Sequence, residues 1–81
     1  MLEAKMRLFV DYMNWKGKRA WREIKPEPGK PLQIETGFYN YPDGSKEHTS
    51  VIYCSMVDRG GARRTLRLAS IYGFRVEEEL G

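Results

Sequence analysis

Two tetrapeptides of the same design constrain the fold of this chain more than any other feature. Residues 14–17 (Asn-Trp-Lys-Gly) and residues 58–61 (Asp-Arg-Gly-Gly) each begin with an Asx side chain and end with glycine. Asx favours the first position of a turn, and glycine takes the left-handed conformation that closes it. Each tetrapeptide lies between segments in which apolar and polar residues alternate. The sequence therefore predicts two antiparallel hairpins.

The first hairpin has a self-consistent register over strands 7–15 and 19–25. Placing Asn14 opposite Lys18 pairs Tyr12 with Ala20, Val10 with Arg22 and Leu8 with Ile24 on one face, and Met13 with Arg19, Asp11 with Trp21 and Phe9 with Glu23 on the other. One face is mostly apolar and the other mixed, as expected of an antiparallel sheet with one wet side. The prolines of residues 26–31 must end the second strand.

The second hairpin joins strands 50–57 and 63–68. The expected pairs are Met56 with Arg64, Cys54 with Leu66 and Ile52 with Leu68, and on the other face Val57 with Arg63, Ser55 with Thr65 and Tyr53 with Arg67. We also expect a weak strand at 32–36, a turn at 42–44, a bend at 69–70 and a short last strand at 71–76. Residues 37–50 are the least predictable segment.

Five or six short strands joined by tight turns predict an all-β fold, a small SH3-like or Sm-like antiparallel barrel. At 81 residues the chain forms one domain, which we place at 1–76, followed by an acidic tail at 77–81. The side chains expected in the core are Leu8, Val10, Tyr12, Ile24, Ile52, Cys54, Leu66, Leu68 and Ile71.

Charge and cysteine content indicate what kind of partner and which cellular compartment suit the protein. The chain carries 14 basic and 11 acidic residues, and three of the acids lie in 77–79, which leaves 14 − 8 = +6 on residues 1–76. Such a basic body suits an anionic partner, although many small proteins are as basic for solubility alone. A single cysteine and the absence of a long apolar run indicate a cytoplasmic protein outside the membrane.

The residues of catalytic or metal chemistry are sparse. The chain has one histidine, His48, six residues from Cys54, with no third ligand of matching type. Gly60 and Gly61 lack the spacing and the lysine of a P-loop, and the acids show no pairing. We therefore expect a non-enzymatic protein without metal or cofactor.

Two separated segments resemble WYL domains. Residues 10–14, Gly17 and residues 22–26 (Arg-Glu-Ile-Lys-Pro) look like the opening hairpin of that family, and residues 51–56, 58–61, 64–68 and Ile71 resemble its closing half. The Trp-Tyr-Leu triplet that names the family is absent. The resemblance implies an Sm-like barrel that senses a ligand or nucleic acid in bacterial regulators and defence systems, with basic residues engaging anionic ligands.

Basic and aromatic residues of the two hairpins supply the expected binding site. They are Arg19, Trp21, Arg22, Lys25, Tyr53, Arg63, Arg64 and Arg67. Bases of single-stranded nucleic acid stack on exposed aromatic rings while cations follow the backbone, and Trp21 is the expected stacking group. In the competing interpretation, residues 37–41 cover Trp21, and Tyr53 with Arg67 is only a cation–π pair.

Arg22 and Arg64 fall on faces that are otherwise apolar. Either both lie at barrel rims and reach water, or they converge on an anionic ligand.

Two functions compete on this evidence. The first is a binding module for nucleic acid or an anionic nucleotide-like ligand, regulatory in a prokaryote or phage. The second is a protein encoded by a phage or mobile element that binds and blocks a host protein, with the same aromatics and arginines as anchors. An exposed edge strand would also allow self-pairing into a homo-oligomer.

Overall fold

The structure is a computed structural model that describes residues 4–80, with side chains from 6 to 78. Six strands make up most of it: β1 (Ala4–Met13), β2 (Arg19–Lys25), β3 (Ile34–Asn40), β4 (Lys46–Met56), β5 (Ala62–Arg67) and β6 (Ile71–Leu80). Two short 3-10 turns, η1 (Val57–Arg59) and η2 (Leu68–Ser70), follow β4 and β5. The expected all-β, antiparallel, barrel-like fold is confirmed. The described chain has no helix long and apolar enough to cross a membrane.

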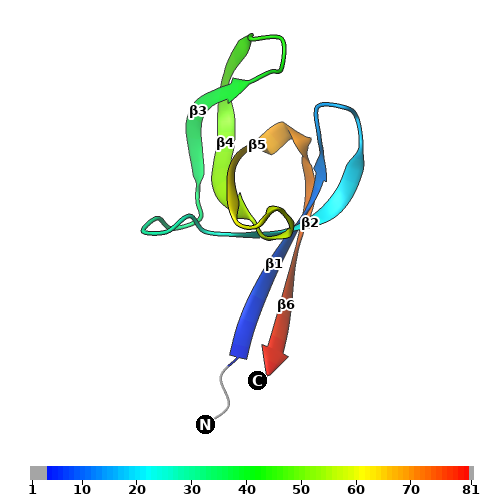
Figure 1. The fold of residues 1–81 in the computed structure, drawn as a ribbon, viewed down its shortest axis with the longest axis vertical. Coiled ribbons are helices and arrows are strands. Elements are labelled where there is room, and N and C mark those ends of the chain that lie inside the picture. Colours follow the sequence, from blue (N-terminus) through cyan, green and yellow to red (C-terminus); the bar gives the residue numbers. More distant parts are fainter. Residues whose placement is uncertain (1–3, 81) are drawn as a thin grey trace.

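The strands form one curled antiparallel sheet in the order β3-β4-β2-β1-β6. β5 pairs with β4 on the edge opposite β3, because Val51 and Ile52 have partners in both strands. The result is a half-barrel, and β1 and β6 leave it side by side as a two-stranded ribbon (Figure 1).

The core lies inside the curl. Six of the nine expected core residues are buried, namely Val10, Tyr12, Ile24, Ile52, Cys54 and Leu66, and Met56 joins them. Leu8, Leu68 and Ile71 are partly buried and pack against this cluster. Burial raises the pKa of the Cys54 thiol to about 11, so this side chain stays neutral as a small core residue.

The first hairpin has the expected register at every pair from Leu8–Ile24 to Met13–Arg19. Its turn works as the sequence indicates. The Asn14 side-chain oxygen accepts hydrogen bonds from the backbone N–H groups of Lys16 (3.0 Å) and Lys18 (2.9 Å). Gly17 takes a φ of 80° and donates its own N–H to the Asn14 carbonyl.

The register expected for the second hairpin is wrong by two residues. Cys54 lies opposite Arg64 rather than Leu66. The loop is 57–61 instead of 58–62, because η1 starts the turn one residue early and the Gly61 N–H bonds to the Met56 carbonyl. A slip of two keeps every side chain on its own face, which is why Cys54 is still buried.

The segment 37–50 forms the outer end of a long hairpin that the sequence predicted only in part. β3 runs to Asn40 and β4 already begins at Lys46. The expected turn at 42–44 joins them, since the Gly44 N–H donates to the Tyr41 carbonyl at 3.0 Å.

The last strand is longer than expected. β6 continues through the acidic residues to Leu80 and stays paired with β1, with Glu77 opposite Arg7 and Glu78 opposite Met6. The acids that we expected in a tail therefore lie in a strand.

Gly37 of β3 leaves room for two side chains of the neighbouring strand β4, Tyr53 and Val51. A Cβ at this position would collide with the Tyr53 hydroxyl and lie 3.2 Å from a methyl group of Val51.

We therefore expect Gly37→Ala to lower the free energy of unfolding by about 1–3 kcal/mol, the usual cost of overpacking. Urea denaturation of the variant and of wild type measures this loss of free energy of unfolding. Gly37→Ala combined with Tyr53→Phe should recover part of the loss, because the colliding oxygen is gone. Equal stability of Gly37→Ala and wild type would contradict this packing.

Candidate functional site

A hollow of about 260 Å³ opens on the concave side of the half-barrel, between β5 and the tip of the β1–β2 hairpin. Its lining is basic and aromatic: Tyr12, Asn14, Trp15, Arg22, Tyr39, Met56, Arg59, Arg64, Thr65 and Leu66. We call it the arginine hollow. It exists because β5 pairs only with β4, so the sheet does not close against the first hairpin.

Three arginines from three elements surround the arginine hollow. Arg22 comes from β2, Arg59 from η1 and Arg64 from β5. Arg22 lies 3.4 Å from the Asp58 carboxylate, and Arg64 donates a 2.8 Å hydrogen bond to the Arg63 carbonyl. In the described part of the chain Arg59 has no ion-pair or hydrogen-bond partner. The lining thus contains three guanidinium groups and no carboxylate, and only Arg22 is paired with an acid of the described chain, Asp58, so the hollow is positive.

Aromatic groups supply the rest of the lining. Trp15, at the hairpin tip, is 60% exposed, with the Lys16 ammonium 5.2 Å from its ring centre. Tyr12 and Tyr39 lie deeper. Burial, reinforced by the neighbouring Tyr39 hydroxyl, raises the pKa of Tyr12, so its hydroxyl keeps its proton at neutral pH. Aromatic rings can stack on a planar group of a ligand, and the guanidinium groups beside them can bind an anionic group of the same ligand.

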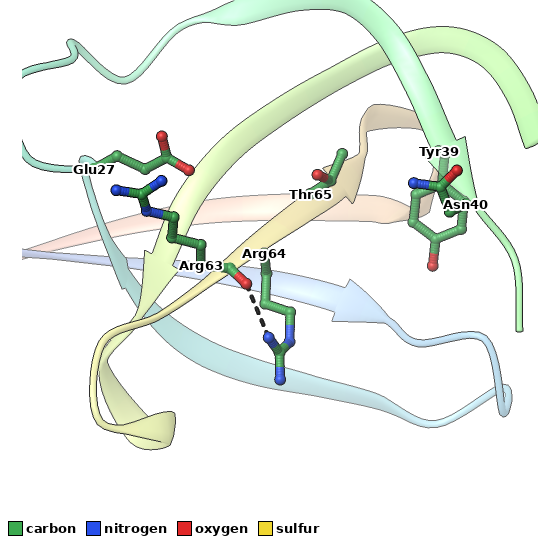
Figure 2. Close-up of a pocket in the computed structure, with 6 residues that line it drawn as sticks. All are labelled: Glu27, Tyr39, Asn40, Arg63, Arg64 and Thr65. Atoms are coloured by element: carbon green, nitrogen blue, oxygen red, sulfur yellow. Dashed lines mark hydrogen bonds between the residues drawn. The ribbon is translucent and has the colours of Figure 1, made fainter.

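A second hollow, of about 300 Å³, adjoins the first and shares Tyr39, Arg64 and Thr65 with it. Figure 2 shows its lining: Arg63 reaches toward Glu27, whereas Arg64 points away from Glu27. Arg63 therefore lies next to the arginine hollow but turns toward an acid.

Arg67 is engaged elsewhere. It donates to the Tyr41 hydroxyl at 2.6 Å and to Glu47 at 2.9 Å, and the Tyr41 hydroxyl donates to the same carboxylate oxygen. These bonds lower the pKa of Glu47. Tyr53 lies opposite Thr65 and near the Lys30 ammonium (5.5 Å). The expected pairing of Tyr53 with Arg67 is wrong, because the register differs by two.

Trp21 and Arg19 lie on the opposite, convex face of the β1–β2 pair. The Trp21 indole passes over Gly73, 3.5 Å from where a Cβ would be, and the Arg75 guanidinium stands 4.8 Å from its ring. Arg19 binds both carboxylate oxygens of Asp11, at 2.7 Å for the shortest bond. These bonds lower the pKa of Asp11.

The structure thus divides the expected site. It brings Arg22 and Arg64 together, as the convergent interpretation of these two arginines requires. It places Arg63 in the adjoining hollow and Arg19, Trp21, Lys25, Tyr53 and Arg67 outside the arginine hollow.

The eight residues expected to form the site do not include Trp15, Arg59 or Tyr39, which line the arginine hollow. Trp15 and Arg59 occupy the same second position of the two similar turns, a signal that was available in the sequence. Tyr39 had no such signal, because its strand lies in the least predictable segment.

No group of three or more His, Cys, Asp or Glu side chains suited to a metal ion occurs among the described residues. Comparison with known proteins found no match to a family model, to a curated protein or to a solved structure.

The Asp11–Arg19 pair predicts a pH dependence of stability. Because hydrogen bonding lowers the pKa of Asp11 in the folded state, its contribution is present at neutral pH and is lost as the pH falls below about 4. Asp11→Asn should be less stable than wild type at neutral pH, and the difference should shrink in acid. Urea denaturation from neutral pH to below about 4 measures this difference in the free energy of unfolding. Arg19→Ala, which removes the partner of Asp11, is the matched variant. A constant difference between Asp11→Asn and wild type would contradict the assignment.

Proposed function

We propose that the arginine hollow binds a phosphate-bearing ligand, a nucleotide or a short single-stranded segment of nucleic acid. The observation that carries this proposal is the convergence of Arg22, Arg59 and Arg64 around a concave site that also contains Trp15 and Tyr39.

The chemistry of these groups supports a phosphate and a base together. Guanidinium groups bind phosphate oxygens through paired hydrogen bonds, and they stay charged at every physiological pH. Bases stack on exposed aromatic rings without strong sequence preference. The size of the hollow, near the lower end for small-molecule sites, fits one nucleotide unit rather than a duplex.

The resemblance to WYL domains supports the same proposal, since it implies a barrel that senses anionic ligands. On this proposal the protein is a non-enzymatic regulatory module of a prokaryote or phage, and it works in the reducing cytoplasm, where a neutral, buried Cys54 is stable.

Titration with mononucleotides, single-stranded and double-stranded oligonucleotides at two salt concentrations tests the proposal. Arg59→Ala and Arg64→Ala should each weaken binding and reduce the salt slope on single strands by about 0.7 for each phosphate that the variant no longer binds. Lys25→Ala is the matched control, because it removes one exposed charge outside the hollow.

Two outcomes of this titration contradict the proposal. The first is no binding even at low salt, which favours the host-protein alternative. The second is equal weakening by Lys25→Ala and Arg59→Ala, because that result indicates charge attraction without a site.

The two tryptophans separate the arginine hollow from the convex face. Trp15→Ala should cost about 1–3 kcal/mol of binding free energy if a base stacks on the ring in the hollow. Trp21→Ala should leave the affinity unchanged, although Trp21 was the stacking group expected from the sequence. Isothermal titration of both variants measures this, and the reverse ranking would move the binding surface to the convex face.

A further inference from the structure

The ends of β1 and β6 that lie away from the arginine hollow form a two-stranded ribbon, which the proposed binding site does not use. The β1–β2 ladder ends at the Leu8–Ile24 pair, whereas the β1–β6 ladder continues to Ala4–Leu80. The ribbon therefore extends beyond the half-barrel with only two strands (Figure 1). Two strands alone are marginal in water, and a third or fourth strand stabilises them.

Apart from Glu78, one face of this ribbon is apolar and open to solvent. Met6 is 73% exposed, Val76 55% and Phe74 52%, and Leu8 between them is partly buried. Because Leu8 lies opposite Val76 and Met6 opposite Glu78, these side chains occupy one continuous stripe on the same face. Clustered apolar side chains of this kind mark an interaction surface, unlike apolar residues scattered singly.

The outer edge of β6 is also open. β6 is the terminal strand in the sheet order, so in the described chain no strand pairs with its second edge. Native proteins protect such edges with charges, and β6 carries Arg75, Glu77 and Glu78. A strand that pairs with this edge must place its own charges so that opposite charges, and not like charges, lie side by side.

We propose that two copies of this chain pair antiparallel along their β6 edges, about a two-fold axis at Val76. A two-fold axis perpendicular to the sheet keeps each side chain on its own face, so only registers centred on a residue are allowed. Centring on Arg75 or on Glu77 places like charges side by side. Centring on Val76 places Arg75 of each copy opposite Glu77 of the other.

The geometry of the single chain supports this register. Arg75 and Glu77 lie on the same face of β6, and their charged groups are 3.4 Å apart. In the pair, the valines meet at the axis and each Phe74 lies opposite Glu78 of the second copy. Two ribbons then become one four-stranded sheet, and their apolar stripes adjoin across the axis.

A charge-swap experiment tests this register. Arg75→Glu places glutamate opposite glutamate, and Glu77→Arg places arginine opposite arginine. By sedimentation equilibrium, each variant alone should dimerise roughly tenfold more weakly than wild type. An equimolar mixture of the two variants restores both opposite-charge pairs, so it should form a heterodimer with an affinity near that of wild type.

The mixture also controls for effects inside one chain. Arg75 stacks on Phe9 (4.9 Å) and Trp21 (4.8 Å), and Arg75→Glu removes both interactions in the single variant and in the mixture alike. Recovery in the mixture therefore reports pairing between copies. Wild type that stays monomeric at the highest soluble concentration would overturn the proposal, and so would a mixture that associates no more tightly than either variant.

Val76→Lys gives a second, independent measurement. It places two like charges at the axis of the dimer, and the exposed position of Val76 lets the single chain fold as before. Circular dichroism checks the fold, and hydrogen exchange reads the amides of 74–78. Those of these amides that point to the outer edge of β6, rather than to β1, should exchange faster in Val76→Lys than in wild type at equal concentration. Equal exchange would contradict pairing through this edge.

Discussion

The curl of the sheet around a small core is the constraint on which the rest of this structure depends. Seven buried side chains, contributed by β1, β2, β4 and β5, meet inside it. β4 makes the curl possible, because it pairs with β3 at its start, with β5 from Val51 onward and with β2 at its end. At Val51 and Ile52 this strand has neighbours on both edges, and both side chains are buried.

The same curl creates the two surfaces that we assign to interactions. A sheet of this length encloses the core without closing, so β5 and the tip of the first hairpin face each other across the arginine hollow. At the other end of the sheet, the paired strands β1 and β6 extend beyond β2 and form the ribbon with the exposed apolar stripe. The hollow is basic and concave, whereas the ribbon has one mostly apolar face and an Arg75–Glu77 ion pair on the other. These properties suit a phosphate-bearing ligand and a second strand, respectively.

The sequence predicted the register and the turn of the first hairpin correctly, because its Asn side chain and its glycine determine the turn, although β1 runs from Ala4 to Met13 rather than over 7–15. The second hairpin was predicted with correct faces but shifted pairs, since two consecutive glycines at 60 and 61 allow more than one turn and alternation cannot detect a slip of two. The β3–β4 hairpin was predicted only in part: its turn at 42–44 and the inner parts of its strands were expected, but the polar residues near the turn lack clear alternation and were not placed in strands. Of the residues expected to bind a ligand, Arg22 and Arg64 line the arginine hollow. Arg22 and Trp21 are neighbours on β2 and must point to opposite faces, so they could not share one surface.

The central claim is that a phosphate-bearing ligand occupies the concave arginine hollow. The chain has only two tryptophans, one at the hollow and one on the convex face, so two indole N–H signals in a proton–nitrogen NMR spectrum report the two sides separately. On titration with a nucleotide, the account predicts that the Trp15 indole signal moves and the Trp21 signal stays in place. Movement of the Trp21 signal alone, or of neither signal at saturating nucleotide, would contradict it.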